Sequence, residues 1–255
     1  MPSRLLPALA ALALLATSCR HAPPADPAAA AIPAGITAIA GIDLSALQRS
    51  PWSAALPPSA RLLLNAVPGA SNLLLAWNGR DLLTLAKGDF AAAPSGFEFI
   101  GPHLAASGPA EIVRASRAQL KTGRTGAPDL LGAASLAAPV PIIWIATAGD
   151  AQLPFSGNLA MLARLLRYTR YTTATVQASQ SVTLDAMGDC PSPAAARELE
   201  EKLRALVSLL AAMSRRPDLQ TVWNSIVIER HDHVVHTHLA LSPESFSKAL
   251  TLLTP

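Results

Sequence analysis

A short turn between two apolar segments constrains the fold of this chain more than any other feature. Segments 72–77 and 81–87 are nearly all apolar, and Asn78-Gly79-Arg80 lies between them. Asn-Gly favours positive φ at both central positions of a tight turn, which joins two antiparallel strands. We therefore expect a β-hairpin here. Because both arms are apolar along their length, we expect it in a central, well-covered part of a sheet.

The second half of the chain alternates strands and helices regularly. The expected elements are strand 140–148, helix 158–168, strands 171–178 and 182–187, helix 193–213, strands 223–230 and 234–241, and a final helix after Ser242. Ser192 is a suitable N-cap for the long helix, and Pro193 suits its first turn. This order predicts an α+β fold, in which an antiparallel sheet of hairpins carries helices on one face. The first half repeats the pattern more loosely, so two ferredoxin-like units are one hypothesis for the architecture.

The chain divides by composition into four expected segments. Residues 1–18 are a signal peptide, and residues 19–35 are a tether rich in Ala and Pro with no apolar periodicity. Such a tether is extended, at ~3.1 Å per residue. Residues 36–138 and 139–255 are the two α+β halves.

The N-terminus has the parts of an export signal. One basic residue, Arg4, precedes a run from Leu5 to Ala16 that contains only Leu, Ala and Pro. This run is well short of the ~20 residues that span a bilayer. Small residues then lead to Cys19, as in a secretory cleavage site. The junction 15–19, Leu-Ala-Thr-Ser-Cys, resembles the lipobox of bacterial lipoproteins. That resemblance implies cleavage before Cys19 and acylation of its sulfur and new N-terminus. An ordinary signal peptide cleaved nearby and a retained anchor are the alternatives.

Composition limits the classes of function. Hydrophobic residues make up 51% of the chain and charged residues only 15%, so it is able to bury a large core. The net charge is +3, and one of these charges leaves with the signal, so nucleic-acid binding by bulk charge is not expected. If Cys19 is acylated, Cys190 has no partner for an internal disulfide. We expect Cys190 to be a packed structural residue.

Four of the six histidines crowd the last expected hairpin, at positions 231, 233, 236 and 238. His236 and His238 are two residues apart on a strand, so their side chains leave the same face. Two imidazoles in this arrangement suit a metal such as Zn²⁺, which needs further ligands, and His231 and His233 in the turn are candidates. The alternative is that Asp232 and its neighbours form an ordinary turn, while His236 and His238 face solvent.

A second candidate is the basic and aromatic segment 164–171, which contains Arg164, Arg167, Tyr168 and Arg170. Arg and aromatic residues in alternation suit a contact with an anionic surface. Cations are also favourable at a helix C-terminus, so a solvated helix end explains the same residues.

The common catalytic and cofactor motifs do not occur in this sequence. It contains no Gly-x-Ser-x-Gly, His-Glu-x-x-His, phosphate-binding or dinucleotide-binding signature. We expect a lipid-anchored protein of the cell envelope that acts, without catalysis or a cofactor, as an interaction or structural module. A small-molecule module with a cleft between the two halves, and a metal-binding protein that uses the histidine hairpin, are the alternatives.

Several features together resemble a family of exported lipoproteins of unknown role from Ala-rich bacteria, the acidobacterial type among them. These features are the lipobox, the Ala/Pro segment, the opening Gly-Ile-Asp-Leu-Ser at 41–45, the turn and helix start at 107–114, and the hairpin–long helix–hairpin ending. The resemblance implies a location on the periplasmic side of the envelope, with the outer membrane favoured over the inner. The expected partners are the membrane, through the lipid at Cys19, and an envelope protein.

Overall fold

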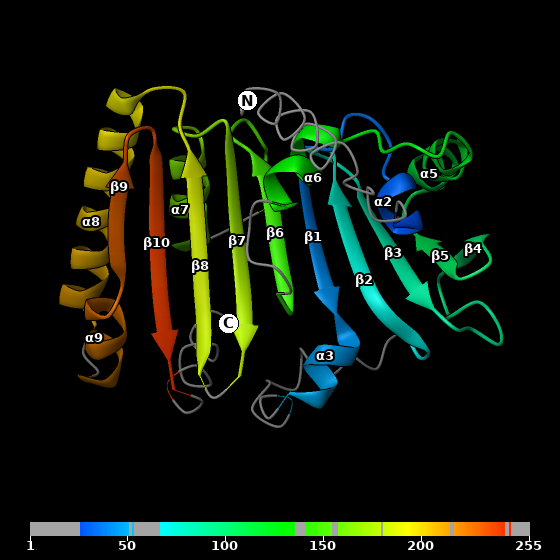
Figure 1. The fold of residues 1–255 in the computed structure, drawn as a ribbon, viewed down its shortest axis with the longest axis horizontal. Helices are drawn as coiled ribbons and strands as arrows, with labels where there is room; N and C mark the ends of the chain where they lie inside the picture. The colour runs from blue at the N-terminus through cyan, green and yellow to red at the C-terminus, as the bar shows by residue number, and fades with distance from the viewer. Residues whose placement is uncertain are drawn as a thin grey trace, which may run out of the picture.

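The structure is a computed structural model that describes residues 26–50, 53, 67–135, 141–154, 158–179, 181–214, 217–242 and 245. Ten strands form one antiparallel sheet (Figure 1). The strands are β1 (Ala38–Asp43), β2 (Ala70–Trp77), β3 (Leu82–Gly88), β4 (Glu98–Gly101), β5 (Leu104–Ser107), β6 (Ile143–Ala148), β7 (Tyr171–Ala178), β8 (Val182–Asp189), β9 (Val227–His231) and β10 (Val234–Leu241). The helices are α2 (Pro27–Ala30), α3 (Leu44–Arg49), α5 (Ala110–Lys121), α6 (Pro128–Ser135), α7 (Asn158–Leu166), α8 (Pro193–Met213) and α9 (Pro217–Asn224). The α+β class and the antiparallel sheet are as predicted.

The two halves of the chain repeat one strand order. Outward from the centre of the sheet, the first half runs β1-β2-β3-β5-β4 and the second half runs β6-β7-β8-β10-β9. Strands β1 and β6 pair with each other and join the halves. In each half the last strand turns back and lies between the two strands that precede it. The topology therefore supports the idea of two equivalent units, which weak sequence similarity alone did not establish.

These units do not have the ferredoxin-like order. In that fold a third strand separates the two strands that flank the first helix, whereas β6 and β7 are direct neighbours across α7. The physical reason is that the β6–β7 pair forms its own antiparallel ladder, from Ile143 with Val176 to Ala148 with Tyr171. One split βαβ does occur, because β10 lies between β8 and β9.

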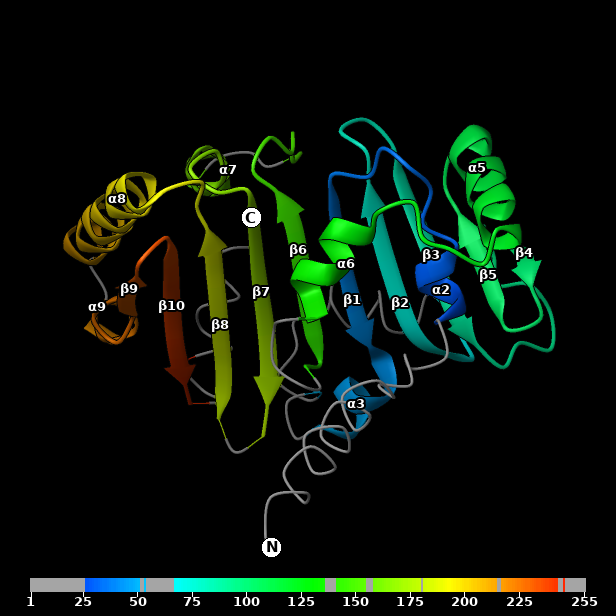
Figure 2. The same ribbon diagram turned by 45° about the horizontal axis from the view of Figure 1, so that its top comes forward.

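We call the two faces of the sheet face A and face B. The helices that cover each face differ between the two halves of the chain. Face B carries α2, α5 and α6 over the first half and the β1–β6 seam, and face A carries α3, α7 and α8 (Figures 1 and 2). The strand register fixes which side chains share a face, since successive residues alternate. One row of cross-strand partners on face B runs from His238 through Asp185, Thr175, Trp144 and Gly41 to Leu74. Along this row the surface changes from polar to apolar.

The largest buried cluster lies on face B of the first half. It contains Ile39, Leu83, Leu85 and Leu104, each at most 2% exposed, and α5 adds Ile112 and Val113. A separate cluster on face A of the second half joins Cys190, Leu199 and Val235 beneath α8. The largest clusters of the two halves therefore lie on opposite sides of a continuous sheet, and a smaller face A cluster of the first half contains Leu44, Val67, Leu73 and Ala86.

The predicted tether is wrong for residues 26–35. Asp26 caps α2, and Ala31 and Ile32 are fully buried in the face B core. Two hydrogen bonds fix this segment, from Ser116 Oγ to the Ala31 carbonyl at 2.7 Å and from the Gly126 amide to the Ile32 carbonyl at 2.8 Å. Small alanines allow close approach to α5, so the Ala-rich composition reflects packing here. Cys19 and the rest of the predicted tether lie outside the described residues.

The hairpin of the first half is confirmed. Strands β2 and β3 pair, and Gly79 has a φ of 98°. The Asn78 side chain accepts hydrogen bonds from the amides of Arg80 and Asp81, at 2.9 and 2.7 Å, and so closes the turn.

In the second half, the long helix α8 has the predicted bounds, with Ser192 Oγ accepting from the Ala195 amide. The strand predicted from Trp223 is wrong at its start, because 217–224 form α9 and β9 begins at Val227. Within the described residues, no helix combines the length and the apolar character needed to cross a bilayer.

Candidate functional site

An exposed polar surface covers face B of strands β8, β10 and β9, and we call it the polar face. Along each strand its side chains alternate with residues on face A, the side that carries α8. Val235, for example, is buried on face A, between Val234 and His236 on face B. The residues of the polar face are Asp185, Glu229, His231, His236 and His238. The side chains of Asp185 and His238 are about half exposed, and those of Glu229 and His231 are mostly exposed. The β9–β10 hairpin and the sequence-distant strand β8 thus bring five ionisable side chains to one surface.

Contacts between strands and within strand β9 organise the polar face. His238 Nδ1 lies 2.6 Å from Asp185 Oδ1 on the neighbouring strand. His231 Nε2 lies 3.6 Å from Glu229 Oε2, and the rings of His231 and His236 meet edge to face with centroids 5.8 Å apart. The carboxylates therefore orient imidazoles at the surface.

His233 is separated from the other three histidines. It lies in the β9–β10 turn, where Asp232 adopts a φ of 53°, and its Nδ1 is 2.7 Å from Asp232 Oδ2. Its other ring nitrogen is 3.6 Å from Asp189. No group of three His, Cys, Asp or Glu side chains in the described part of the chain is arranged to hold a metal ion. Metal binding by His231, His233, His236 and His238 stays a prediction.

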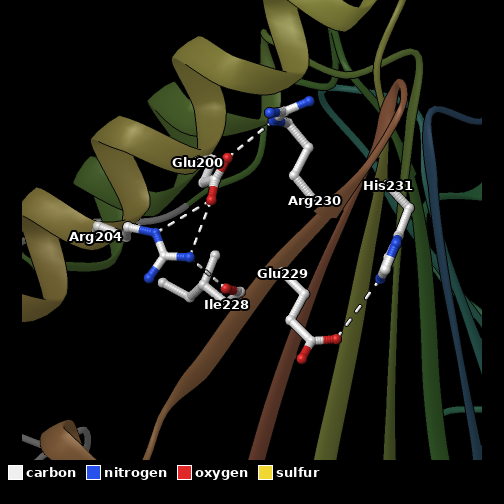
Figure 3. Close-up of polar contacts among 6 residues, drawn as sticks. All are labelled: Glu200, Arg204, Ile228, Glu229, Arg230 and His231. Carbon is white, nitrogen blue, oxygen red and sulfur yellow. Dashed lines mark hydrogen bonds and ion pairs between the residues drawn. The ribbon is translucent and has the colours of Figure 1, made fainter.

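Behind the polar face, charged contacts fix the edge strand β9 to helix α8 (Figure 3). Glu200 accepts from Arg204 at 2.9 Å and from Arg230 Nε at 2.9 Å. These hydrogen bonds, first that from Arg204 and then that from Arg230, lower the pKa of Glu200. Arg204 also donates to the outward carbonyl of Ile228 at 2.6 Å. The position of Glu229 and His231 on the opposite side of β9 depends on this attachment.

The other edge of the sheet is covered in the same way. Arg117 of α5 donates to the carbonyl of Phe99 in β4 at 3.2 Å and pairs with Glu98 at 3.3 Å. A guanidinium from a helix thus occupies an exposed backbone acceptor on each edge strand. Charged groups at such positions oppose pairing with another chain.

Cys190 is a packed residue in the structure. It is fully buried in the face A core, and its thiol lies 3.8 Å from the Gly188 carbonyl. Burial raises the pKa of the Cys190 thiol, with a smaller contribution from the charge of Asp189. A buried thiol with a raised pKa is a poor nucleophile.

The basic and aromatic segment is divided between two surroundings. Tyr168 packs against the α8 core, and the Lys202 ammonium lies 5.4 Å from the centre of its ring. Arg170 pairs with Asp189 at 3.0 Å. Arg164 and Arg167 line an open groove beside the end of α7.

A cleft between the two halves was expected as an alternative site, and the described part of the β1–β6 seam has a small cavity. Its volume is about 170 Å³, and its lining includes Asp26, Gly41, Asn72, Lys87 and Trp144. Pockets for small-molecule ligands commonly measure about 300–1,000 Å³. The Trp144 indole fills the space over Gly41, where an added Cβ would collide with it.

The sequence predicted the histidines but not their partners. Asp185 is 53 residues from His238 along the chain, so only the pairing of β8 with β10 brings them together. The alternation of Thr183 and Asp185 with apolar residues was the one available signal, since it placed both on the solvent side of their strand.

Comparison with known proteins identifies a fold and no family. No family model matches this sequence, and no curated protein matches it. Crystal form III of TP0453 matches with a TM-score of 0.53 at 7% identity, over 87% of this chain and 96% of that chain. Crystal forms I and IV give TM-scores of 0.48 and 0.47 at 7% and 8% identity. The form III match shows that the α+β architecture also occurs in a solved structure.

Proposed function

We propose that this chain is a lipid-anchored protein of the cell envelope that acts, without catalysis, as an interaction module. The observation that carries the proposal is the polar face. It presents Asp185, Glu229 and three histidines on a regular sheet surface, while α7 and α8 pack on the opposite side. Reacting groups are usually held in concave sites that exclude water, whereas these side chains pair with neighbours at an open surface.

The charge of the polar face favours one kind of partner. Two carboxylates, on strands β8 and β9 to either side of β10, lie among imidazoles, and no Lys or Arg points to this face from β8, β9 or β10. A protein surface with Lys or Arg opposite Asp185 and Glu229 is complementary to it. The sequence at 15–19 supports a location in the envelope, where the partner is expected.

The lipid anchor is tested by metabolic labelling of the full chain with an alkyne analogue of palmitate. We expect label and membrane association in the unaltered protein, and neither in Cys19→Ala. Mass spectrometry that finds Met1 at the N-terminus, or an unmodified sulfur at Cys19, would contradict the anchor.

The interaction face is tested by site-specific photo-crosslinking in the native envelope. A photoreactive residue at His236 is expected to capture one defined envelope protein. The same residue at Glu201, which is exposed on α8 on the other side of the sheet, is the control and should not capture it. The double change Asp185→Lys and Glu229→Lys is expected to abolish the product. Equal capture from both positions, or capture that survives the charge reversal, would refute the polar face as the interface.

A further inference from the structure

A groove outside the polar face collects three arginines at one end of the β6-α7-β7 unit. It lies between the loop that follows β6, residues 149–153, and the end of α7, and residues 169–171 complete it. Arg164, Arg167 and Arg170 are among its lining residues, all of them exposed. The lining residues include three arginines and one carboxylate, Asp150, so positive charge is in excess in the groove.

Two of these arginines have no carboxylate partner in the part of the chain that the structure describes. Arg170 pairs with Asp189 at 3.0 Å, and that contact, together with the charge of Asp189, raises the pKa of Arg170. Arg167 instead donates to the Arg164 carbonyl at 3.5 Å. The groove therefore contains guanidinium groups that no carboxylate in the described part of the chain neutralises.

Hydrogen bonding to the helix end accounts for the Arg167 guanidinium, which donates to the Arg164 carbonyl, but not for that of Arg164. The last carbonyls of α7 already have donors, since the Tyr168 amide reaches Leu165 at 3.1 Å and the Thr169 amide reaches Leu166 at 2.9 Å. The Thr169 hydroxyl adds a second bond to Leu166 at 2.7 Å. The Arg164 guanidinium is consequently not needed to cap the helix.

The floor of the groove is held in place before any ligand arrives. The Gly149 amide donates to the Arg170 carbonyl at 2.9 Å, and the Trp77 indole donates to the Gln152 carbonyl at 2.6 Å. A Cβ at Gly149 would collide with the Thr169 carbonyl, so this close approach requires glycine. A fixed floor lowers the entropic cost of binding.

We propose that this groove is a binding site for a phosphate group, which Arg164 and Arg167 hold and Arg170 assists. Guanidinium groups form paired hydrogen bonds with phosphate oxygens, and an exposed group of them without carboxylate partners suits such an anion. The phosphate belongs either to a free phosphorylated compound or to a lipid headgroup. The inference goes beyond the proposed interaction module, and it does not require Cys19 to carry lipid.

The test is protection from arginine modification in the purified full chain in detergent. Phenylglyoxal modifies exposed guanidinium groups, and peptide mass spectrometry measures the rate at each arginine. Inorganic phosphate is expected to slow modification of Arg164 and Arg167 about tenfold. Arg114 on α5, which is exposed and distant in the sheet, is the internal control and should react at an unchanged rate. Equal rates at Arg164 and Arg167 with and without phosphate would overturn the proposal.

Vesicles distinguish the two sources of phosphate. Protection by vesicles of phosphatidylcholine with phosphatidylglycerol, but not by phosphatidylcholine alone, identifies a headgroup site. Protection by inorganic phosphate alone identifies a site for a soluble phosphorylated ligand. In either case, phosphate titration by calorimetry is expected to show binding about tenfold weaker in Arg164→Gln with Arg167→Gln, and unchanged in Arg114→Gln. Unchanged binding in the double variant would refute the assignment of these residues.

Discussion

Gly149 leaves no room for a side chain, because a Cβ would collide with the Thr169 carbonyl. Gly149→Ala is therefore expected to lower the free energy of unfolding by about 1–3 kcal/mol, as overpacking does. Urea denaturation followed by circular dichroism measures the change. Gly132 in α6 has nothing within 4 Å of the same position, so Gly132→Ala is the matched control. It is expected to stabilise the protein by about 0.5–1 kcal/mol. A destabilisation of equal size in both variants would contradict the packing argument.

Cys190 is fully buried, and burial raises the pKa of its thiol. We expect no reaction of Cys190 with a maleimide at pH 7 in the folded protein, over a time that suffices for complete reaction in urea. Mass spectrometry of the 190-containing peptide measures the extent. Rapid labelling without denaturant would show that the face A core opens locally, and it would remove the structural role from this residue.

At the residue scale, the sequence predicted whether a side chain is buried or exposed better than it predicted which residues that side chain contacts. The packed role of Cys190 was expected because the sequence offers it no disulfide partner, and exposure of His236 and His238 followed from strand alternation. The contact of His238 with Asp185 did not follow, since it depends on a register between strands that the local pattern leaves free.

The link between α8 and β9 makes stability depend on pH through Glu200. Its hydrogen bonds with Arg204 and Arg230 lower its folded pKa below the ordinary value of 4.5. A lowered carboxyl pKa stabilises the fold above the unfolded pKa, and that stabilisation is lost as pH falls through the folded value. Glu200→Gln is therefore expected to be less stable than the unaltered protein at pH 7, and by a smaller margin at pH 2–3. Urea midpoints at both pH values test this.

Glu201→Gln is the control for that experiment, since Glu201 is the exposed carboxylate one residue further along α8. Its midpoint should differ little from that of the unaltered protein at either pH. A Glu200→Gln variant with the same pH dependence as the unaltered protein would contradict the role of the Arg204 and Arg230 contacts.

The edge strands β4 and β9 are protected by Arg117 and Arg204. Removal of both guanidinium groups leaves the outward carbonyls of Phe99 and Ile228 free to pair with another chain. The double variant Arg117→Ala with Arg204→Ala is expected to self-associate with rising concentration, as measured by sedimentation velocity. Arg114→Ala, which removes an exposed arginine from the same helix α5, should leave the sedimentation coefficient unchanged. A monodisperse double variant would show that other features protect the edges.

At the element scale, local signals were sufficient for α8 and insufficient for α9. Ser192, Pro193 and a regular apolar stripe fixed the bounds of α8. Around Trp223 the apolar residues fit either period over a short span, so a strand was predicted where a helix turn precedes β9. Like other short elements, α9 depends more on its tertiary contacts, here with α8, than on its own sequence.

The continuous sheet has a consequence for unfolding. Strands β1 and β6 pair along their length, from Ala38 with Thr147 to Ile42 with Ile143. We expect the two halves to unfold in a single transition. Three variants that each retain one tryptophan, at Trp77, Trp144 or Trp223, report on the first half, the seam and the second half. Their fluorescence transitions in urea should each coincide with the circular dichroism transition of the same variant. A fluorescence change at Trp223 that precedes the loss of secondary structure would show that the halves are separate folding units.

At the scale of the whole molecule, the order of elements predicted the class but not the placement of layers. Alternation of hairpins and helices was enough for an α+β fold with an antiparallel sheet. The prediction that the helices pack on one face was wrong, since α5 packs on face B and α8 packs on face A. The apolar stripe of each helix is compatible with either face, so the sequence does not decide the side. The burial of Ala31 and Ile32 was missed for a related reason, since a segment of small residues has no periodicity to indicate packing.

The docking of α2 against the core determines how far the folded body can stand from a membrane. If Cys19 is embedded in a lipid leaflet, only seven residue steps separate it from Asp26, and a fully stretched chain covers at most about 25 Å over that span. Such a short linker would keep the folded domain close to the lipid headgroups and limit its rotation. Lengthening the segment between Cys19 and Asp26 with Gly-Ser pairs would then extend the radius within which the protein can search for its partner.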